Sequence, residues 1–126
     1  MAARRRILLI LIRHVQNVQV EVEPFRRPDW EPLPYEGCVN VEGRVLLWDE
    51  TLGLALLRFG EHATIHEHPG ENDTVVFCLE GSGWTSVADE AAELRAGERV
   101  VWPAGVGHRL WTEATTMTTL MYERLA

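Results

Sequence analysis

The sequence predicts an all-β fold, either a sandwich or a barrel, and two observations carry that prediction. About nine short runs of apolar and β-branched residues are separated by turns that contain Gly or Pro, which is the pattern of short strands. No stretch has both the length and the apolar repeat that a long helix needs. With 126 residues, of which 46% are hydrophobic, the chain is long enough to build the core of one domain.

The N-terminal segment is expected to lie outside that domain. Three arginines precede an apolar run, residues 7–12, which imitates the start of a secretory signal. The run is shorter than the roughly 7–15 apolar residues of a signal peptide or the roughly 20 of a membrane span. We therefore interpret residues 1–14 as a strand, a flexible arm or a start site placed too far upstream, and residues 15–126 as a single β-barrel domain.

The domain is predicted to begin with a half-buried strand at residues 15–23, because valines alternate with polar residues from Val18 to Val22. Four prolines then interrupt regular structure over residues 24–34, with aromatic residues between them. Flexible linkers are poor in aromatic residues. We therefore expect this segment to be an ordered coil that lies over the barrel or over a partner subunit.

The rest of the chain predicts short strands joined by tight turns. Residues 49–53 predict the turn of a hairpin, and residues 81–83 and 103–107 predict two further turns. Residues 88–97 are rich in helix formers but lie between strands, so we expect a turn and a short strand there. The remaining apolar runs predict strands at residues 39–41, 44–48, 54–59, 62–68, 74–79, 84–87, 99–102, 108–112 and 116–122.

Charge and cysteine content narrow the range of partners. The net charge of −7 argues against nucleic acid and anionic membrane surfaces, although it selects no substrate. The two cysteines, Cys38 and Cys78, lack the spacing of a metal or redox motif. We expect both to be reduced, buried thiols in a cytoplasmic protein.

Three of the five histidines, His62, His66 and His68, lie within seven positions. Alternate residues of a strand point to the same face, so these three and Thr64 are expected to share one face. A neutral imidazole is the commonest metal ligand among protein side chains. An isolated His-x-His pair, however, is more often a pair of polar residues on a solvated strand.

A second stretch strengthens the metal interpretation. Gly97, Pro103, Gly105 and His108 follow the spacing of Gly, five residues, Pro-x-Gly, two residues and His. This stretch brings one more imidazole to the end of a turn that is fixed by Gly and Pro.

Together the two stretches resemble the paired motifs of the cupin superfamily. In the first motif, Gly60 is followed after five residues by His66-x-His68, and the apolar run and glycine turn at residues 76–83 close it. In the second motif, the final Asn of the family is replaced by Thr112. The resemblance covers about residues 38–122, and the combination of two motifs is more specific than either alone.

The resemblance implies a double-stranded β-helix, or jelly-roll, barrel of the small single-domain type with an N-terminal strand or arm. It also implies that His66, His68 and His108 converge inside the barrel and hold one divalent transition metal. The type of ligand leaves the metal open among Zn, Fe, Mn, Ni and Cu. Small cupins commonly pair, so the resemblance further implies a homodimer.

The fourth ligand is the point at which the sequence departs from the family. The usual glutamate falls on Thr74 when the spacing is counted back from Gly81, and Thr offers only a neutral hydroxyl. Asp73 is close, but strand alternation turns it away from the face of Thr74. We therefore expect a three-histidine site completed by water or substrate, with Asp73, Glu71 and His62 as the alternatives.

Other side chains near the motifs are expected to be structural. Trp84, Trp102 and Trp111 could wall a pocket, but packing in the core is the stronger interpretation for each. Alternation places Glu67 on the outer surface and Arg109 on the face opposite to His108.

Two classes of function remain open. The first is a metal-dependent enzyme that acts on a small molecule as an oxygenase, decarboxylase, isomerase or lyase. The second is a non-catalytic module that binds a metal or small ligand, such as a sensor. No acid–base pair has a recognisable spacing, so the sequence does not predict catalytic residues.

Overall fold

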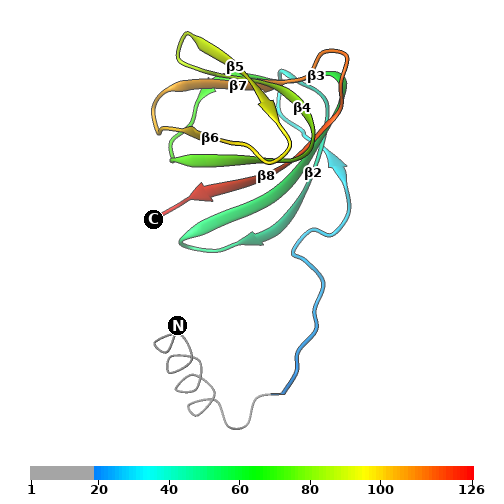
Figure 1. Cartoon of the computed structure of the whole chain (residues 1–126). Coiled ribbons are helices and arrows are strands. Elements are labelled where there is room, and N and C mark those ends of the chain that lie inside the picture. The colour runs from blue at the N-terminus through cyan, green and yellow to red at the C-terminus, as the bar shows by residue number, and fades with distance from the viewer. Residues whose placement is uncertain (1–18) are drawn as a thin grey trace, which may run out of the picture.

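The computed structural model describes residues 19–126, which form eight strands and no helix (Figure 1). These residues therefore have the predicted all-β architecture. The strands are β1 Glu31–Pro32, β2 Cys38–Trp48, β3 Leu52–Pro69, β4 Thr74–Val87, β5 Glu90–Arg95, β6 Arg99–Trp102, β7 Gly107–Trp111 and β8 Met117–Arg124.

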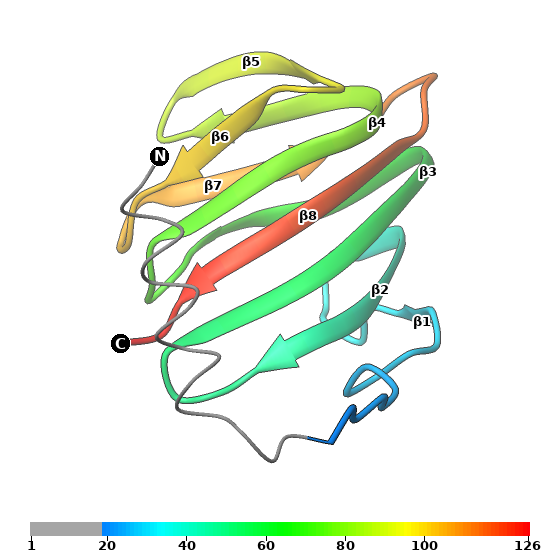
Figure 2. The same cartoon turned by 60° about the horizontal axis from the view of Figure 1, so that its bottom comes forward.

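Two long strands, β3 and β4, close the sheet into a barrel (Figure 2). Both β7 and β8 pair with β3 on one side and with β4 on the other. The first half of β3, residues 52–59, pairs with β8, and its second half, residues 64–69, pairs with β7. Because β3 and β4 bend from one half of the barrel to the other, the fold is the double-stranded jelly roll that the motifs predict.

The interior of the barrel is filled by apolar side chains from both halves. The largest that are fully buried include Trp102, Phe59 and Leu110. Five polar residues are buried with them: Thr74, Thr85, His108, Thr112 and Thr119. A buried polar group must find a hydrogen-bond partner or serve another purpose, so these five are the first places to look for a site.

The segment before β2 lies along the barrel at Trp30, as predicted, but β1 pairs with β2 where coil was expected, and Phe25 and Tyr35 are 50% and 69% exposed. The Arg27 amide donates to the Val45 carbonyl at 3.1 Å. The Trp30 ring lies beneath two guanidinium groups, with Arg58 at 4.3 Å and Arg44 at 5.2 Å from the ring centroid. Cation–π contacts of this kind fix the coil against the outer face of β2 and β3.

The predicted strand at residues 15–23 is wrong for the part that the structure describes. Residues 19–23 form coil, and Val20 and Val22 are 91% and 92% exposed. Alternation predicts a strand only where a neighbour supplies hydrogen bonds, and the first pairing along the described chain begins at Glu31. Residues 15–18 and the proposed arm, residues 1–14, lie outside the described residues.

Six of the predicted strands merge into three longer ones. The runs at 39–41 and 44–48 join as β2, those at 54–59 and 62–68 as β3, and those at 74–79 and 84–87 as β4. The predicted turn at residues 81–83 is wrong, because Gly81 is a bend with φ +73° inside β4. Left-handed residues let the strands turn a corner without losing their partners.

The later elements agree with the predictions to within a few residues. The short strand expected within residues 88–97 is β5, and the turn expected near residues 103–107 joins β6 to β7. Cys38 and Cys78 are free, and Cys78 is buried whereas Cys38 is half-buried. Residues 19–126 contain no helix with the length and apolarity that a membrane crossing requires.

Candidate metal centre

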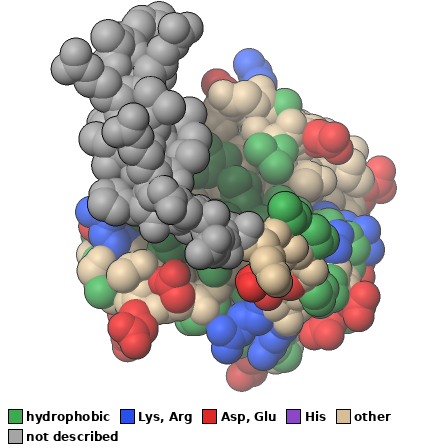
Figure 3. All heavy atoms as spheres, turned by 90° about the horizontal axis from the view of Figure 1, so that it is seen from below, with side chains coloured by type: hydrophobic (Ala, Val, Ile, Leu, Met, Phe, Trp, Pro, Cys, Tyr) green, Lys and Arg blue, Asp and Glu red, His purple; other side chains and the backbone are tan. Residues whose placement is uncertain are grey.

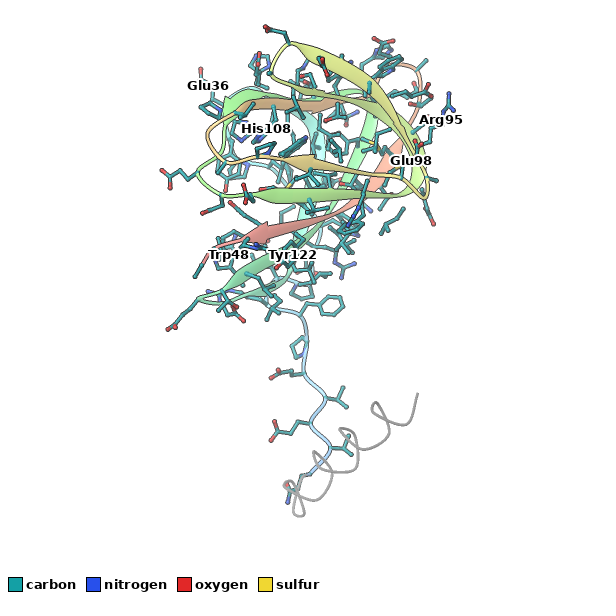
Figure 4. All side chains as sticks on the ribbon, turned by 60° about the vertical axis from the view of Figure 1, so that its left-hand side comes forward. Glu36, Trp48, Arg95, Glu98, His108 and Tyr122 are labelled. Atoms are coloured by element: carbon teal, nitrogen blue, oxygen red, sulfur yellow. The ribbon has the colours of Figure 1, made fainter. Side chains whose placement is uncertain are left out.

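His68 and His108 lie side by side on neighbouring strands. They are direct register partners of β3 and β7. Their ring centroids are 4.6 Å apart, and the ring planes meet at 69°. Figure 4 shows His108 toward the end of the barrel that carries Glu36 and Trp48, away from Arg95 and Glu98 at the other end. Two of the three predicted ligands are therefore brought together.

A bulge in β3 separates His66 from this pair. Ile65 pairs with Leu110 and His68 pairs with His108, so two residues of β3 oppose Arg109 alone. One strand of a bulge carries an extra residue, which breaks the alternation of its side chains. A Cβ built on Gly37 would lie 2.6 Å from Cδ2 of His66, so the His66 ring lies against Gly37 on the β2 side.

The common face expected for four residues is therefore wrong, because His68 alone of the four is the register partner of the buried His108. Ala63 and Ile65 are buried, whereas Thr64 accepts a hydrogen bond from Nε of Arg109 at 3.1 Å. His62 is exposed, has φ +52° and donates its amide hydrogen to the Glu113 carbonyl. The regular alternation of side chains ends at the β3 bulge between Ile65 and His68, which the sequence did not predict.

His108 is a buried imidazole in apolar surroundings. It is 3% exposed, and its ring stacks on that of Trp102 at 4.0 Å with 9° between the planes. Its Nδ1 is buried without a hydrogen-bond partner of normal geometry. Burial lowers the pKa of His108, and the neighbouring His68 lowers this pKa further, against a weaker opposite effect of the Val106 backbone. A neutral imidazole beside a second histidine has the chemistry of a metal ligand.

His68 is oriented by its own strand. Its Nδ1 lies 2.9 Å from the carbonyl oxygen of His66. If Nδ1 donates in this bond, Nε2 carries the free lone pair, which is the usual arrangement of a metal-ligating histidine. His68 and His108 therefore fit a divalent transition metal. Among the residues that the structure describes, no group of three His, Cys, Asp or Glu side chains is close enough to hold a metal as it stands.

The position of the family glutamate is occupied by a buried neutral residue. Thr74 is 6% exposed and is the register partner of Trp102 in β6 and of Glu123 in β8. Its hydroxyl donates to the Asn72 carbonyl at 3.4 Å. Thr74 thus faces the barrel interior, as the alignment through Gly81 predicts, but offers no charge.

The two nearby carboxylates are directed elsewhere. Oδ1 of Asp73 accepts a hydrogen bond from the Ala104 amide at 2.8 Å, so this carboxylate holds the turn between β6 and β7. Glu71 is exposed in the loop before β4. The same turn is tied to that loop by a 2.7 Å hydrogen bond from the Gly105 amide to the Gly70 carbonyl. Asp73 is therefore bonded to the turn that precedes His108.

Core packing was expected for all three tryptophans near the motifs, but only one of them is buried. Trp102 is buried at 2% exposure, but Trp84 is 37% exposed, and its register partner Trp111 is half-buried, so core packing is wrong for these two. Arg109 lies opposite to His108 as predicted, with its guanidinium 4.4 Å from the Trp111 ring centroid. Glu67 is exposed, also as predicted.

The hydrogen bonds of two buried threonines, Thr85 and Thr112, were not predicted from the sequence. The Thr85 hydroxyl accepts a hydrogen bond from Nε1 of Trp102 at 3.0 Å and donates to the Arg109 carbonyl at 3.0 Å. The Thr112 hydroxyl accepts from the Ala63 amide at 3.1 Å and donates to the Gly60 carbonyl. The only sequence signal was the replacement of the motif Asn by Thr112. The partners of both threonines come from distant strands.

Comparison with known proteins identifies the type of domain. A family model described as the cupin domain matches residues 53–122. The fold is similar to that of the polyketide cyclase RemF from Streptomyces resistomycificus, with a TM-score of 0.74 and 19% identity over 86% of this chain and 81% of that chain. No curated protein matches the sequence.

Two further solved structures share the fold. One is KdgF from Halomonas sp., with a TM-score of 0.68 and 16% identity over 78% of this chain and 88% of that chain. The other is the DMSP lyase DddQ from Ruegeria pomeroyi, with a TM-score of 0.67 and 17% identity over 76% of this chain and 55% of that chain. At such low identities, the likeness shows the fold and leaves the activity open.

Proposed function

Because the chain belongs to the cupin family, we propose that it is a small metal-binding cupin that acts on a small molecule as an oxygenase, decarboxylase, isomerase or lyase. The observation that carries the proposal is the pairing of His68 with a buried His108, the two ring centroids lying 4.6 Å apart. A buried polar side chain beside a second imidazole calls for a purpose, and a metal ion would serve it.

The proposed ligands are His66, His68 and His108, with one ion of Zn, Fe, Mn, Ni or Cu. His68 and His108 are supported by their geometry, and His66 is supported by the motif alone. When bound, such an ion would supply Lewis-acid or redox chemistry to a substrate oxygen. The residues of this chain contribute an apolar wall, through Trp102 and Leu110, that keeps water from one side of His108.

Enzymatic activity is supported by the neighbours that share the fold, among which are a polyketide cyclase and a DMSP lyase. Both names describe reactions of small molecules. The substrate of this chain would enter at the end of the barrel where His68 is exposed and where a small residue, Gly70, borders His108.

The test is the metal content of protein that is purified without a histidine tag. We expect one equivalent of metal in the wild type and none in the double variant His66→Ala/His68→Ala, by elemental analysis. His62→Ala is the matched control, because His62 is an exposed histidine of the same strand and lies outside the proposed ligand set. Unchanged metal content in the double variant would refute the proposed ligands.

A non-catalytic metal-binding or sensor cupin is the second candidate. The observation in its favour is that, within residues 19–126, no carboxylate joins the histidine pair: Thr74 is neutral and Asp73 holds a turn. General acid–base catalysis usually needs such a group within hydrogen-bond reach. A screen of small acids and sugars distinguishes the two, because turnover supports the enzyme, whereas saturable binding without turnover supports the sensor.

The proposal includes a homodimer. In the half of the barrel built from β2, β3, β8, β4 and β6, the outward side chains form two cross-strand apolar rows. The rows are Leu47–Leu54–Tyr122–Val75–Val101 and Leu56–Leu120–Phe77. We name them the outer apolar face; a sheet that is apolar on both sides usually has a second cover.

A further inference from the structure

His108 lacks the kind of support that a metal-binding histidine normally has. Such a histidine usually donates its second ring nitrogen to a carboxylate, a carbonyl or water, and that bond fixes the plane of the ring. Nδ1 of His108 has no hydrogen-bond partner of normal geometry, and the Val106 backbone acts on this ring only weakly. A further contact is therefore needed to hold the ring in one orientation.

Trp102 is the side chain that can hold it. The indole and the imidazole are nearly parallel, at 9°, with centroids 4.0 Å apart, and both residues are almost fully buried. The lone pair of an imidazole nitrogen lies in the plane of its ring. Rotating His108 about its Cβ–Cγ bond would break the stack, so the stack fixes the plane in which His108 can offer a lone pair.

Trp102 is itself anchored by a chain of hydrogen bonds. Its Nε1 donates to Oγ1 of Thr85 at 3.0 Å, and the same hydroxyl donates to the Arg109 carbonyl at 3.0 Å. Arg109 is the next residue after His108 in β7. Thr85 is 4% exposed and pairs in register with Leu110. The indole is therefore tied, through one hydroxyl, to the backbone that carries His108.

From this arrangement we infer that Trp102, held by Thr85, is the positioning residue that orients His108 for metal binding. The inference rests on the proposed metal site. A hydroxyl that only filled space in the core would be replaceable by a methyl group without consequence for the site. A hydroxyl that fixes the indole would not be replaceable in this way.

The experiment compares substitutions at two buried threonines. Thr85→Val keeps the shape of the side chain and removes the hydrogen bonds, and Thr85→Ser restores a hydroxyl. Thr119→Val is the matched control, because Thr119 is 0% exposed and bonds only to the Leu57 carbonyl in the other half of the barrel. Co²⁺ is the probe, since its visible spectrum reports the geometry of its ligands.

We expect Thr85→Val to weaken Co²⁺ binding by roughly tenfold, the size of effect seen when outer support of a ligand is lost, and to change the cobalt spectrum. Thr85→Ser should recover both properties, and Thr119→Val should leave both unchanged. Wild-type affinity and spectrum in Thr85→Val would overturn the inference. Equal losses in Thr85→Val and Thr119→Val would also overturn it, because they would indicate a general loss of stability.

A second readout needs no metal. In the metal-free protein, the ring protons of His108 should show the upfield NMR shift of a proton stacked on an indole, and Thr85→Val should reduce that shift. If the wild type shows the upfield shift but binds no Co²⁺, the proposed metal-binding function is wrong, and so is the role of Trp102 in metal binding. The stack of Trp102 on His108 would still be established by the shift. An unshifted His108 in the wild type would overturn the positioning role alone.

Discussion

Asp73 is bonded to the backbone of a turn and is also the carboxylate nearest to the position of the family glutamate. Its carboxylate accepts from the Ala104 amide and so holds the turn that precedes His108. We expect Asp73→Ala to keep metal affinity within roughly tenfold of the wild type, or about 1.4 kcal/mol, because no direct ligand is lost. Stability should fall by about 1 kcal/mol, since one hydrogen bond to a charged group is removed.

The measurement is a metal titration together with thermal unfolding, and Glu71→Ala is the control for the loss of one negative charge in the same loop. A loss of affinity of a hundredfold or more, with circular dichroism unchanged, would show that Asp73 is the fourth ligand. The assignment of the family position to Thr74 would then be wrong.

The two thiols should differ in reactivity. Burial raises the pKa of Cys78, and the charge of Glu98 raises it further, against a weaker effect of the Glu80 backbone; burial also raises the pKa of Cys38. A raised thiol pKa leaves less of the reactive thiolate at any pH below that pKa. We expect Cys38, which is half-buried, to react slowly with a thiol reagent at pH 8, and the buried Cys78 to react only when the barrel opens.

In the variant Cys38→Ser, a thiol reagent can label only Cys78. The labelling rate of the same variant in denaturant gives the rate for a Cys78 that the fold does not protect. Labelling of Cys78 in the native variant at the rate seen in denaturant would contradict the prediction.

At the scale of elements, the sequence predicted the strands better than their junctions. The region from β5 to β8 agrees closely because each short strand there is bounded by Gly, Pro or polar residues. The corners in β3 and β4 were taken for strand ends, because a bulge and a turn have the same composition. For the same reason, the sequence predicted that His68 and His108 lie close together but did not predict the bulge at His66. The stack of Trp102 on His108 could not be predicted, because it depends on the tertiary fold.

Gly81 forms the bend in β4, and its backbone conformation favours glycine. Its φ is +73°, and an added Cβ would collide with the Thr116 carbonyl oxygen. We expect Gly81→Ala to destabilise the protein by about 3 kcal/mol, from the left-handed conformation and from the collision. Gly97→Ala is the matched control, because Gly97 also has positive φ, +90°, but nothing lies within 4 Å of its added Cβ.

Chemical denaturation of the two variants measures the difference. Gly97→Ala should lose only about 1 kcal/mol, which is the conformational part alone. Equal losses in both variants would show that the Thr116 contact relaxes and that β4 does not depend on this corner.

At the scale of the whole molecule, a common barrel does not determine a common reaction. The similar structures include a cyclase and a lyase on one fold at 19% and 17% identity to this chain. Two features of this barrel bear on its reaction: the neutral Thr74, at the position where the cupin motif has a glutamate, and the tryptophan stacked on a candidate ligand. The reaction must therefore be found by testing substrates, with the metal identified first.

The outer apolar face predicts that two barrels assemble into a dimer. The outer apolar face combines half-buried leucines in the middle with Leu47 and Val101 at its ends, which are 44% and 51% exposed. Figure 3 shows hydrophobic side chains gathered on the side of the molecule that is seen from below. We expect a dimer by light scattering at tens of micromolar, a range where modest association is populated.

Leu120→Glu should shift the protein to monomer, because two copies would bring buried like charges together in the middle of the interface. Val39→Glu is the matched control, because Val39 is an apolar residue, 53% exposed, whose backbone pairs with Thr64 in the other half of the barrel. Deleting residues 1–23 should weaken the dimer if that segment crosses to the partner. A strictly monomeric wild type would rule out the homodimer, whereas a dimer that survives Leu120→Glu and is lost in Val39→Glu would move the interface to the half of the barrel that contains β7.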